Sequence, residues 1–485
     1  MGLIISSAQL LKSAPSCFPS DDRPVFVSGD CDDSSCDRSS GLTALSTFFK
    51  PRSITSDLTY RNNMTFFERF RGAESFSFFT ADLTILFQEN VKGSPLGSAF
   101  FGTNPLTIAE QGSPIYSAHL GLGSFQPEGF SSTIRLSPKR EVFALLPQLL
   151  FNGNESLPGL WFDLACALVR VKHHLGLSEQ VLTPGDIDDL KTIIQALDEL
   201  ELFPTDRTHT GLDDIEVRAG YIIPYCEDDM LSGYVVGRFP TGSCFDNSRW
   251  FQPLVGSRNG AVGAGLMFDC TLSFDEFTTN ECLFMAELKY LYNFDTVDTR
   301  QFDLKNGPLS RFMLVVPEDD HTNPLSAVPL LRQCVIIEPF FTVEFWMGLH
   351  YVYCNWGFEA TYNLWFREQE TIRARPFFFP PVGIYDMTRC ADTTSHSTAR
   401  ISDAFFVGTA DTSFVRLDSN DVLLSSGAVR EARSHTISGT VSYSNEWCNW
   451  NYSVALSARY EFAGNHRHTS TLENWGLFGK ISVSC

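Results

Sequence analysis

Residues 342–368 read TVEFWMGLHYVYCNWGFEATYNLWFRE and contain two apolar alternations of opposite parity. The apolar residues are odd-numbered before Cys354-Asn355 and even-numbered after it. Period two is the pattern of a β-strand with one apolar face and one polar face. A two-residue hairpin loop requires such a switch of parity. We therefore predict a hairpin in which Met347 lies opposite Tyr362 on the apolar face.

The same alternation recurs along the chain. Residues 451–462, NYSVALSARYEF, keep it for the whole segment, with Arg459 and Glu461 on the polar parity. Residues 159–171 change parity near Leu168-Val169, which indicates a β-bulge there. The pattern predicts roughly twelve strands, at residues 75–90, 132–151, 159–172, 213–225, 230–240, 260–274, 281–294, 334–353, 356–373, 432–444, 451–463 and 474–485.

The composition limits the classes of protein. The chain has 485 residues and a formal net charge of −21, which argues against nucleic acid as a partner. The apolar runs are shorter than the roughly 18 residues of a transmembrane helix. The 13 cysteines are spread without CxxC or Cys/His spacing, so we expect no metal site and no cofactor.

Long half-apolar strands allow a soluble sandwich, as in a capsid or lectin-like protein, or a membrane barrel. Three features favour the barrel: strands long enough to cross hydrocarbon, aromatic residues near strand ends, and alternating short and long connections. An even strand number also puts both termini on the short-turn side. We expect an all-β, transmembrane, antiparallel up-and-down barrel of 12–14 strands, with one amphipathic helix in an outer loop.

Residues 260–294 and 342–485 resemble porin-like β-barrel proteins of the Gram-negative outer membrane. The resemblance is architectural and extends over residues 75–485. It implies an outer-membrane location, with membrane lipid and small solutes as partners and room for a homo-oligomer. The last residue, Cys485, departs from the family, because such chains commonly end in an aromatic residue.

Charged residues of the polar parity are expected to line the lumen. A mixed ring of acids and bases can filter solutes by size and charge. The leading hypothesis is a pore for small solutes; the alternative is a structural or adhesive surface barrel without an open pore. His350 faces Glu359 without a nucleophilic serine beside it, so we expect no catalytic site. The pore-lining set is Glu287, Lys289, Glu344, His350, Glu359, Arg367, Arg459, Glu461 and Lys480.

Two other segments carry expectations. Residues 184–202 space Ile187, Leu190, Ile194, Leu197 and Leu200 as one face of a helix. Its other face is acidic and predicts an outer-loop lid that favours cations, made by Asp188, Asp189, Asp198 and Glu199. Residues 1–74 lack sustained alternation and are expected to be a periplasmic tail or a plug segment, with the barrel at 75–485.

Overall fold

We describe a computed structural model of the chain. Residues 44–485 belong to one compact unit. The structure describes residues 49–62, 79–91, 93–109, 113, 115–120, 122, 130–153, 157–183, 192–199, 207–224, 229–242, 251–275, 280–305, 307–319, 325–375, 379–384, 416–447, 450–463 and 472–485. Among these residues, no helix is long and apolar enough to cross a membrane.

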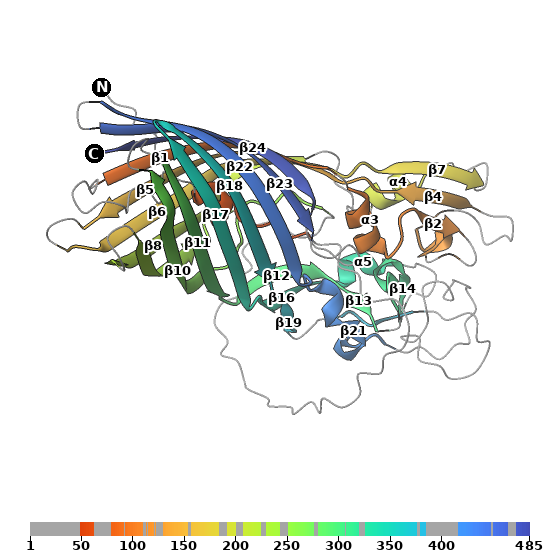
Figure 1. The fold of residues 1–485 in the computed structure, drawn as a ribbon. Helices are drawn as coiled ribbons and strands as arrows, with labels where there is room; N and C mark the ends of the chain where they lie inside the picture. Colours follow the sequence, from red (N-terminus) through yellow and green to blue (C-terminus); the bar gives the residue numbers. More distant parts are fainter. Residues whose placement is uncertain are drawn as a thin grey trace, which may run out of the picture. The chain divides into compact units, whose positions relative to one another are not determined.

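Twelve antiparallel strands form a closed barrel (Figure 1). Each strand pairs with its neighbour along the chain, and the first pairs with the last, so the ladder has no free edge. The strands are β1 (Phe79–Asn90), β5 (Lys139–Asn152), β6 (Leu160–His174), β8 (Arg207–Pro224), β9 (Met230–Phe239), β10 (Ala261–Asp275), β11 (Asn280–Asn293), β17 (Phe341–Tyr353), β18 (Trp356–Arg367), β22 (Ala432–Trp447), β23 (Trp450–Ala463) and β24 (Asn474–Ser484).

The predicted hairpin register is confirmed. Met347 pairs with Tyr362 and His350 with Glu359 across β17 and β18. Cys354 takes the left-handed backbone conformation that a tight two-residue turn requires, with a φ of 52°. The single closed ladder also excludes the sandwich, which needs two facing sheets.

Three expected strands are shorter than the sequence pattern predicts. The segment 132–151 is divided into β4 (Ser131–Arg135) and β5, and 334–353 into β16 (Arg332–Glu338) and β17. The segment 356–373 ends as a barrel strand at Arg367, and β19 (Thr371–Arg373) pairs with β16 instead. Alternation alone does not reveal where a strand leaves the barrel, because the outlying strands alternate as well.

The expected bulge lies in a neighbouring strand. β6 keeps one parity throughout, and its register against β8 shifts between Cys166 and Leu168. β8 has the extra residue, so both Asp213 and Asp214 are buried. The bulge is therefore in β8 and not in β6, where we predicted it, but it lies beside residues next to the predicted Leu168-Val169.

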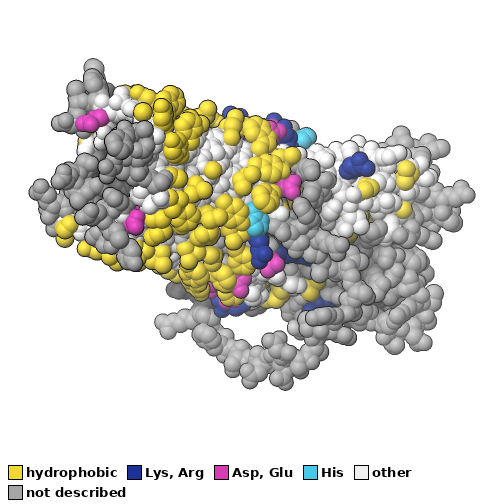
Figure 2. Space-filling model, viewed as in Figure 1, with side chains coloured by type: hydrophobic (Ala, Val, Ile, Leu, Met, Phe, Trp, Pro, Cys, Tyr) yellow, Lys and Arg dark blue, Asp and Glu magenta, His cyan; other side chains and the backbone are white. Residues whose placement is uncertain are grey.

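The outer face of the barrel is apolar. Figure 2 shows hydrophobic side chains gathered over the strands. Leu456 is 67% exposed and Val235 63%, whereas the neighbouring Arg459 and Glu461 are buried on the opposite face of their strand. An exposed apolar surface of this extent marks a region that contacts lipid or protein.

The two ends of the barrel differ. One end, the short-turn end, has the connections 153–159, 225–229, 276–279, 354–355 and 448–449, and there Phe79 and Cys485 exchange backbone hydrogen bonds of 3.3 and 3.1 Å. The other end, the loop end, has connections with their own secondary structure. These elements are α3 (Ser94–Phe101), β2 (Leu106–Ala109), β3 (Ile115–Tyr116), η1 (Ser117–Leu120), β4, β7 (Ser178–Thr183), α4 (Ile193–Glu199), β12 (Thr296–Gln301), β13 (Asp303–Leu304), η3 (Ser310–Phe312), β14 (Leu314–Pro317), β15 (Leu325–Ser326), α5 (Ala327–Leu330), β16, β19, β20 (Val382–Gly383), η5 (Ser419–Asp421), β21 (Val422–Leu423) and η6 (Leu424–Gly427).

Most of these loop-end elements contribute to one apolar core, which we name the loop layer. Its buried residues come from connections far apart in sequence, including Phe100, Phe251, Phe302 and Leu472. The long connections therefore pack on one another rather than standing alone as separate loops.

The structure describes only part of the predicted helix of residues 184–202, and there the buried face differs from the expected one. Within the described residues the helix is α4, and residues 184–191 and 200–202 lie outside them. Ile193 and Ala196 are buried, whereas Ile194 is 38% exposed. The buried face thus differs from the expected stripe at the one member whose burial is described. The helix contacts η1 of the loop layer. The helical period in the sequence does not show where this contact lies, so it does not predict which face is buried.

Candidate functional site

Residues 49–62, which we name the lumen segment, pack against the inner face of the barrel. Phe49 belongs to the loop-layer core at one end of the segment. At the other end the short helix α1 (Leu58–Arg61) begins after Asp57, whose carboxylate accepts a hydrogen bond of 2.9 Å from the amide of Thr59. An N-cap of this type satisfies one free amide of a helix start. All residues from 53 to 62 are buried.

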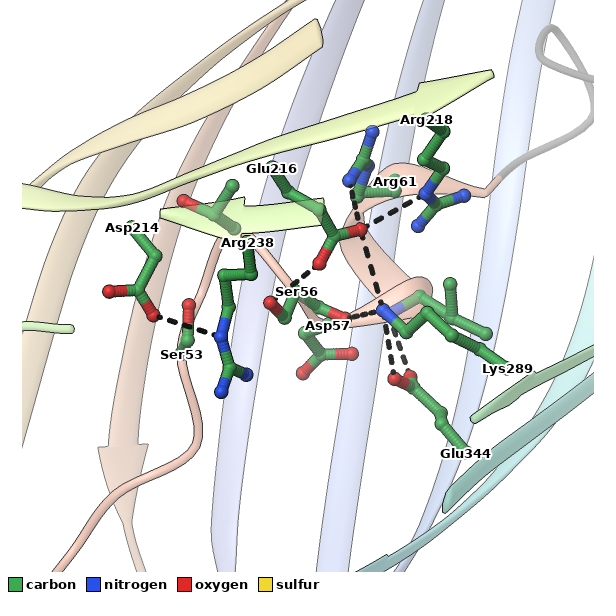
Figure 3. A network of polar contacts seen from close by, with 12 residues as sticks. Ser53, Ser56, Asp57, Arg61, Asp214, Glu216, Arg218, Arg238, Lys289 and Glu344 are labelled. Carbon is green, nitrogen blue, oxygen red and sulfur yellow. Dashed lines mark hydrogen bonds and ion pairs between the residues drawn. The ribbon is translucent and has the colours of Figure 1, made fainter. Parts of the chain in front are cut away.

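Arg61 makes the deepest ionic contacts of the lumen segment (Figure 3). Its Nη1 donates to Glu216 of β8 at 2.5 Å and its Nη2 donates to Asp163 of β6. All three side chains are fully buried. Arg218 adds a second cation, with Nε 3.0 Å from Glu216. Two guanidinium groups therefore neutralise carboxylates that could not stay charged alone in so dry a place.

A lysine of the wall contacts the middle of the lumen segment. The Nζ of Lys289 donates to the carbonyl of Ser56 and lies 3.4 Å from Glu344 and 3.6 Å from Glu216. The amide of Leu58 donates to Glu344 at 2.7 Å. The wall thus binds backbone groups of the segment as well as its side chains (Figure 3).

Asp57 connects the lumen segment to the opposite wall. Its carboxylate lies 2.8 Å from the Nη1 of Arg459 and 3.0 Å from the Nη2 of Arg52. Arg459 also donates to Glu461 at 2.6 Å and stacks on Tyr60, 4.7 Å from the ring centroid. Contacts to β6, β8, β11, β17 and β23 surround the segment, so it is held from several sides of the barrel.

Lys50 and Glu370 form an ion pair where the lumen segment enters at the loop end. The Lys50 ammonium donates to Glu370 at 2.9 Å and to Asn259 at 2.7 Å. Burial lowers the pKa of Lys50 to about 8, although Glu370 opposes the shift. Burial alone would raise the pKa of Glu370, but Lys50, Arg300 and Arg367 together lower it to about 2. The carboxylate is therefore held charged by three cations.

The expected pore-lining residues are all buried on the inner parity of their strands. Most of them contact the lumen segment or its neighbours instead of an open channel. Glu287 accepts from Asn62 at 2.5 Å, Lys480 donates to the carbonyl of Arg61 at 2.8 Å, and Arg367 donates to the carbonyl of Lys50 at 3.0 Å. His350 and Glu359 lie opposite each other across β17 and β18. Their role as a pore lining stays a prediction.

The expected acidic lid falls largely outside the described residues. Asp188 and Asp189 are not described. Asp198 and Glu199 belong to α4, and the structure describes their backbone but not their side chains. The cation preference assigned to this lid stays a prediction. The domain boundary at residue 74 lies outside the described residues as well.

The sequence pattern missed some of the acids and bases around the lumen segment. Asp163, Glu216 and Arg218 stand on the inner parity of β6 and β8, and extension of the parity rule to these noisier strands would have found them. Arg52 and Arg61 lie in a segment without period, so no alternation could indicate them. Residues 51–62 offer only one local signal, the N-cap residue Asp57 before a helical turn.

Small cavities separate the lumen segment from the wall. One has a volume of about 30 Å³ and is lined by Arg52, Arg238 and Arg367 among others. A second has about 40 Å³ beside Arg140 and Glu461. A cavity needs roughly 10–15 Å³ for one water molecule, so each holds only a few.

Comparisons with known proteins return no family. No protein-family model matches the chain, and no curated protein matches it. Among solved structures it is similar to the COG4313 outer membrane channel from Pseudomonas putida F1, with 9% identity, 83% of this chain and 95% of that chain covered and a TM-score of 0.38. The transport unit of the autotransporter AIDA-I from Escherichia coli has 9% identity, coverages of 85% and 90%, and a TM-score of 0.33. A Pseudomonas aeruginosa FadL homologue has 10% identity, coverages of 84% and 89%, and a TM-score of 0.28. The assignment of the fold rests on the strand ladder, not on these likenesses.

Proposed function

We propose that the protein is an outer-membrane channel for small solutes that the lumen segment closes. The observation that carries the proposal is the contrast between the two faces of one closed ladder. The outer face is apolar, and the inner face carries charged groups that bind a separate, non-ladder piece of chain. A barrel with this polarity suits a membrane outside and a polar passage inside.

The lumen segment is proposed as the plug because side-chain contacts hold it, and side-chain contacts can be exchanged. The backbone hydrogen bonds between the twelve strands close the barrel without any contribution from the lumen segment. Water can replace the donors and acceptors of the segment on the wall, whereas no similar replacement exists for a ladder strand in lipid. Release of the segment would therefore leave the barrel intact and its polar lumen wet.

A structural or adhesive surface barrel is the second candidate. The loop layer supports it, because the long connections share a core of their own and present a stable surface at one end of the barrel. In that case the lumen segment would be a permanent filling and the barrel would conduct nothing.

Bilayer recordings compare the wild type with a variant lacking residues 51–62. We expect few or no steady current steps from the wild type and stable steps from the deletion variant. A matched control deletes residues 192–199 at α4, which leaves the lumen segment in place. Folding of each variant is checked by its resistance to unfolding in cold detergent. A folded deletion variant that carries no current would favour the structural barrel.

Membrane residence has its own test. The protein is expected to need detergent or lipid to stay monodisperse, since its exposed apolar band would otherwise self-associate. A monodisperse sample in plain buffer would contradict the outer-membrane location.

The mild cation preference and the homo-oligomer are proposed with the channel. The cations around the lumen segment oppose that preference, so the sign of the reversal potential will decide which group of charges dominates.

A further inference from the structure

We propose that the cavity between the lumen segment and the wall binds a small oxyanion, such as phosphate or a carboxylate. The cavity lies at the loop end, with a volume of about 30 Å³. Four cationic side chains line it, with one acidic side chain, Glu344. The four cations are Lys50, Arg52, Arg238 and Arg367.

Glu344 is already occupied by other donors. It accepts hydrogen bonds from Arg52, from the amide of Leu58 at 2.7 Å and from Asn363 at 2.7 Å, and Lys289 lies 3.4 Å away. The remaining acids that contact these cations are Asp57, Asp214 and Glu370, and none of them lines the cavity. The lining of the cavity therefore holds more cationic than acidic side chains, while the other carboxylates lie behind the cations and outside the lining.

Two of the guanidinium groups keep buried donors without a partner among the described residues. Arg52 uses Nη2 for Glu344 and Asp57, while its Nε and Nη1 have no hydrogen-bond acceptor. The Nε of Arg238 also has no hydrogen-bond acceptor, and it lies 3.7 Å from Asp214. Buried donors of charged groups strongly favour an acceptor, and an oxyanion accepts from several guanidinium nitrogens at once.

Two of the four cations lie against the same ring, that of Trp365, which also lines the cavity. Arg52 and Arg367 each stack on its indole, 5.7 and 5.4 Å from the ring centroid. Two cations on one ring repel each other, and a bound anion would offset that repulsion. Thr342 also lines the cavity; its hydroxyl accepts from Asn293 at 3.2 Å and keeps its own hydrogen to donate.

The cavity lies between the lumen segment and the wall, so an anion bound there would contact both. Arg52 belongs to the lumen segment, whereas Arg238 and Arg367 belong to β9 and β18 of the wall. An anion that bridges them would fasten the segment to the barrel. This consequence for conduction rests on the proposed channel, while the binding itself does not.

Calorimetric titration of the detergent-solubilised protein with inorganic phosphate, at constant ionic strength set with sodium chloride, tests the site. We expect saturable binding of one phosphate, weakened about ten-fold or more by Arg52→Gln or Arg238→Gln. Arg416→Gln is the matched control, because Arg416 is exposed and pairs with Glu318 far from the cavity. It should leave the affinity unchanged.

Failure of the wild type to show saturable binding would overturn the site, whatever the variants do. Equal affinities in the wild type, Arg52→Gln and Arg238→Gln would show an adventitious ion only. If phosphate binds and the two variants weaken it, bilayer recordings with phosphate should show fewer openings than recordings with chloride. Binding without that effect would keep the site and count against the lumen segment as the gate.

Discussion

The hairpin of β17 and β18 is part of the barrel wall and the lumen segment lies against the inner face of that wall, and different forces position them. The hairpin is determined by a local rule: alternate residues point to opposite faces, and a two-residue turn sets the pairing of Met347 with Tyr362. The lumen segment has no period. Its place is set by ion pairs to partners as distant as Arg459, which lies 402 residues from Asp57 in sequence.

The difference between the two regions also concerns the kind of stability. A strand in the ladder is fixed by backbone hydrogen bonds that lipid cannot replace. The lumen segment is fixed by charged side chains, for which water is an adequate substitute. We therefore expect substitutions in the hairpin to affect assembly of the barrel and substitutions in the segment to affect its closure.

The largest effect is expected from Arg61→Met. The change removes one of the two guanidinium groups that neutralise the buried Asp163 and Glu216, and Arg218 alone of the two remains beside them. Removal of one member of a buried ion pair costs about 3–5 kcal/mol. The segment should leave its position, which is measured as increased cleavage of residues 49–62 by added protease. The double variant Arg61→Met with Asp163→Asn should recover part of the loss. Equal protection of the wild type and Arg61→Met would show that other contacts hold the segment.

The second effect, somewhat smaller, concerns the hairpin. Met347→Arg or Tyr362→Arg places a charge on the outer face, which costs about 2–4 kcal/mol near the middle of a bilayer. Folding into liposomes, followed by the mobility shift of the folded barrel, should show the loss. Thr361→Arg is the matched control, since Thr361 is buried on the inner face beside Ser438. Equal damage at all three positions would contradict the assignment of the faces.

Acid should loosen the lumen segment where it enters the barrel. The folded pKa of Glu370 is about 2, below its ordinary value of 4.5, so its contribution to stability is present above pH 4.5. That contribution is lost as the pH falls from about 4.5 through about 2. The pKa of Lys50 is lowered as well, to about 8, so its titration favours the seated segment as the pH rises from 8 to 10.5.

Protease cleavage of the lumen segment, measured from pH 10 to pH 3, should therefore increase only on the acid side. In the Glu370→Gln variant the segment should be cleaved faster at pH 7 than in the wild type, and its cleavage should depend less on pH between 4.5 and 3. A wild type whose cleavage rises only above pH 8 would reverse the sign and contradict the ion pair as the origin.

The smallest effect is expected at the acidic lid. Replacement of Asp188, Asp189, Asp198 and Glu199 by Asn or Gln should reduce a cation preference by no more than a few-fold, because charges in solvated loops are screened within about 8–10 Å. The reversal potential of the variant lacking residues 51–62 measures it, with and without the four substitutions. An unchanged reversal potential would show that the four acidic residues lie outside the permeation path.

The alternation of apolar residues alone predicted an up-and-down barrel of roughly twelve strands and the apolar parity of each strand. Twelve alternating segments were enough, because the parity of a strand is a local property that neighbours do not alter. The inner position of Arg459 and Glu461 and the register of the hairpin follow from the same rule, and the structure has both.

The sequence did not determine where alternating segments leave the barrel, as with β4 and β16, or which face of α4 is buried. These depend on the loop layer, whose core joins residues from connections far apart in the chain. Nor did it identify Arg52, Asp57 and Arg61 as partners of the wall. Only the closed barrel brings their charges within 4 Å of acids and bases on several strands, because buried charges select partners by distance in space rather than by spacing in sequence.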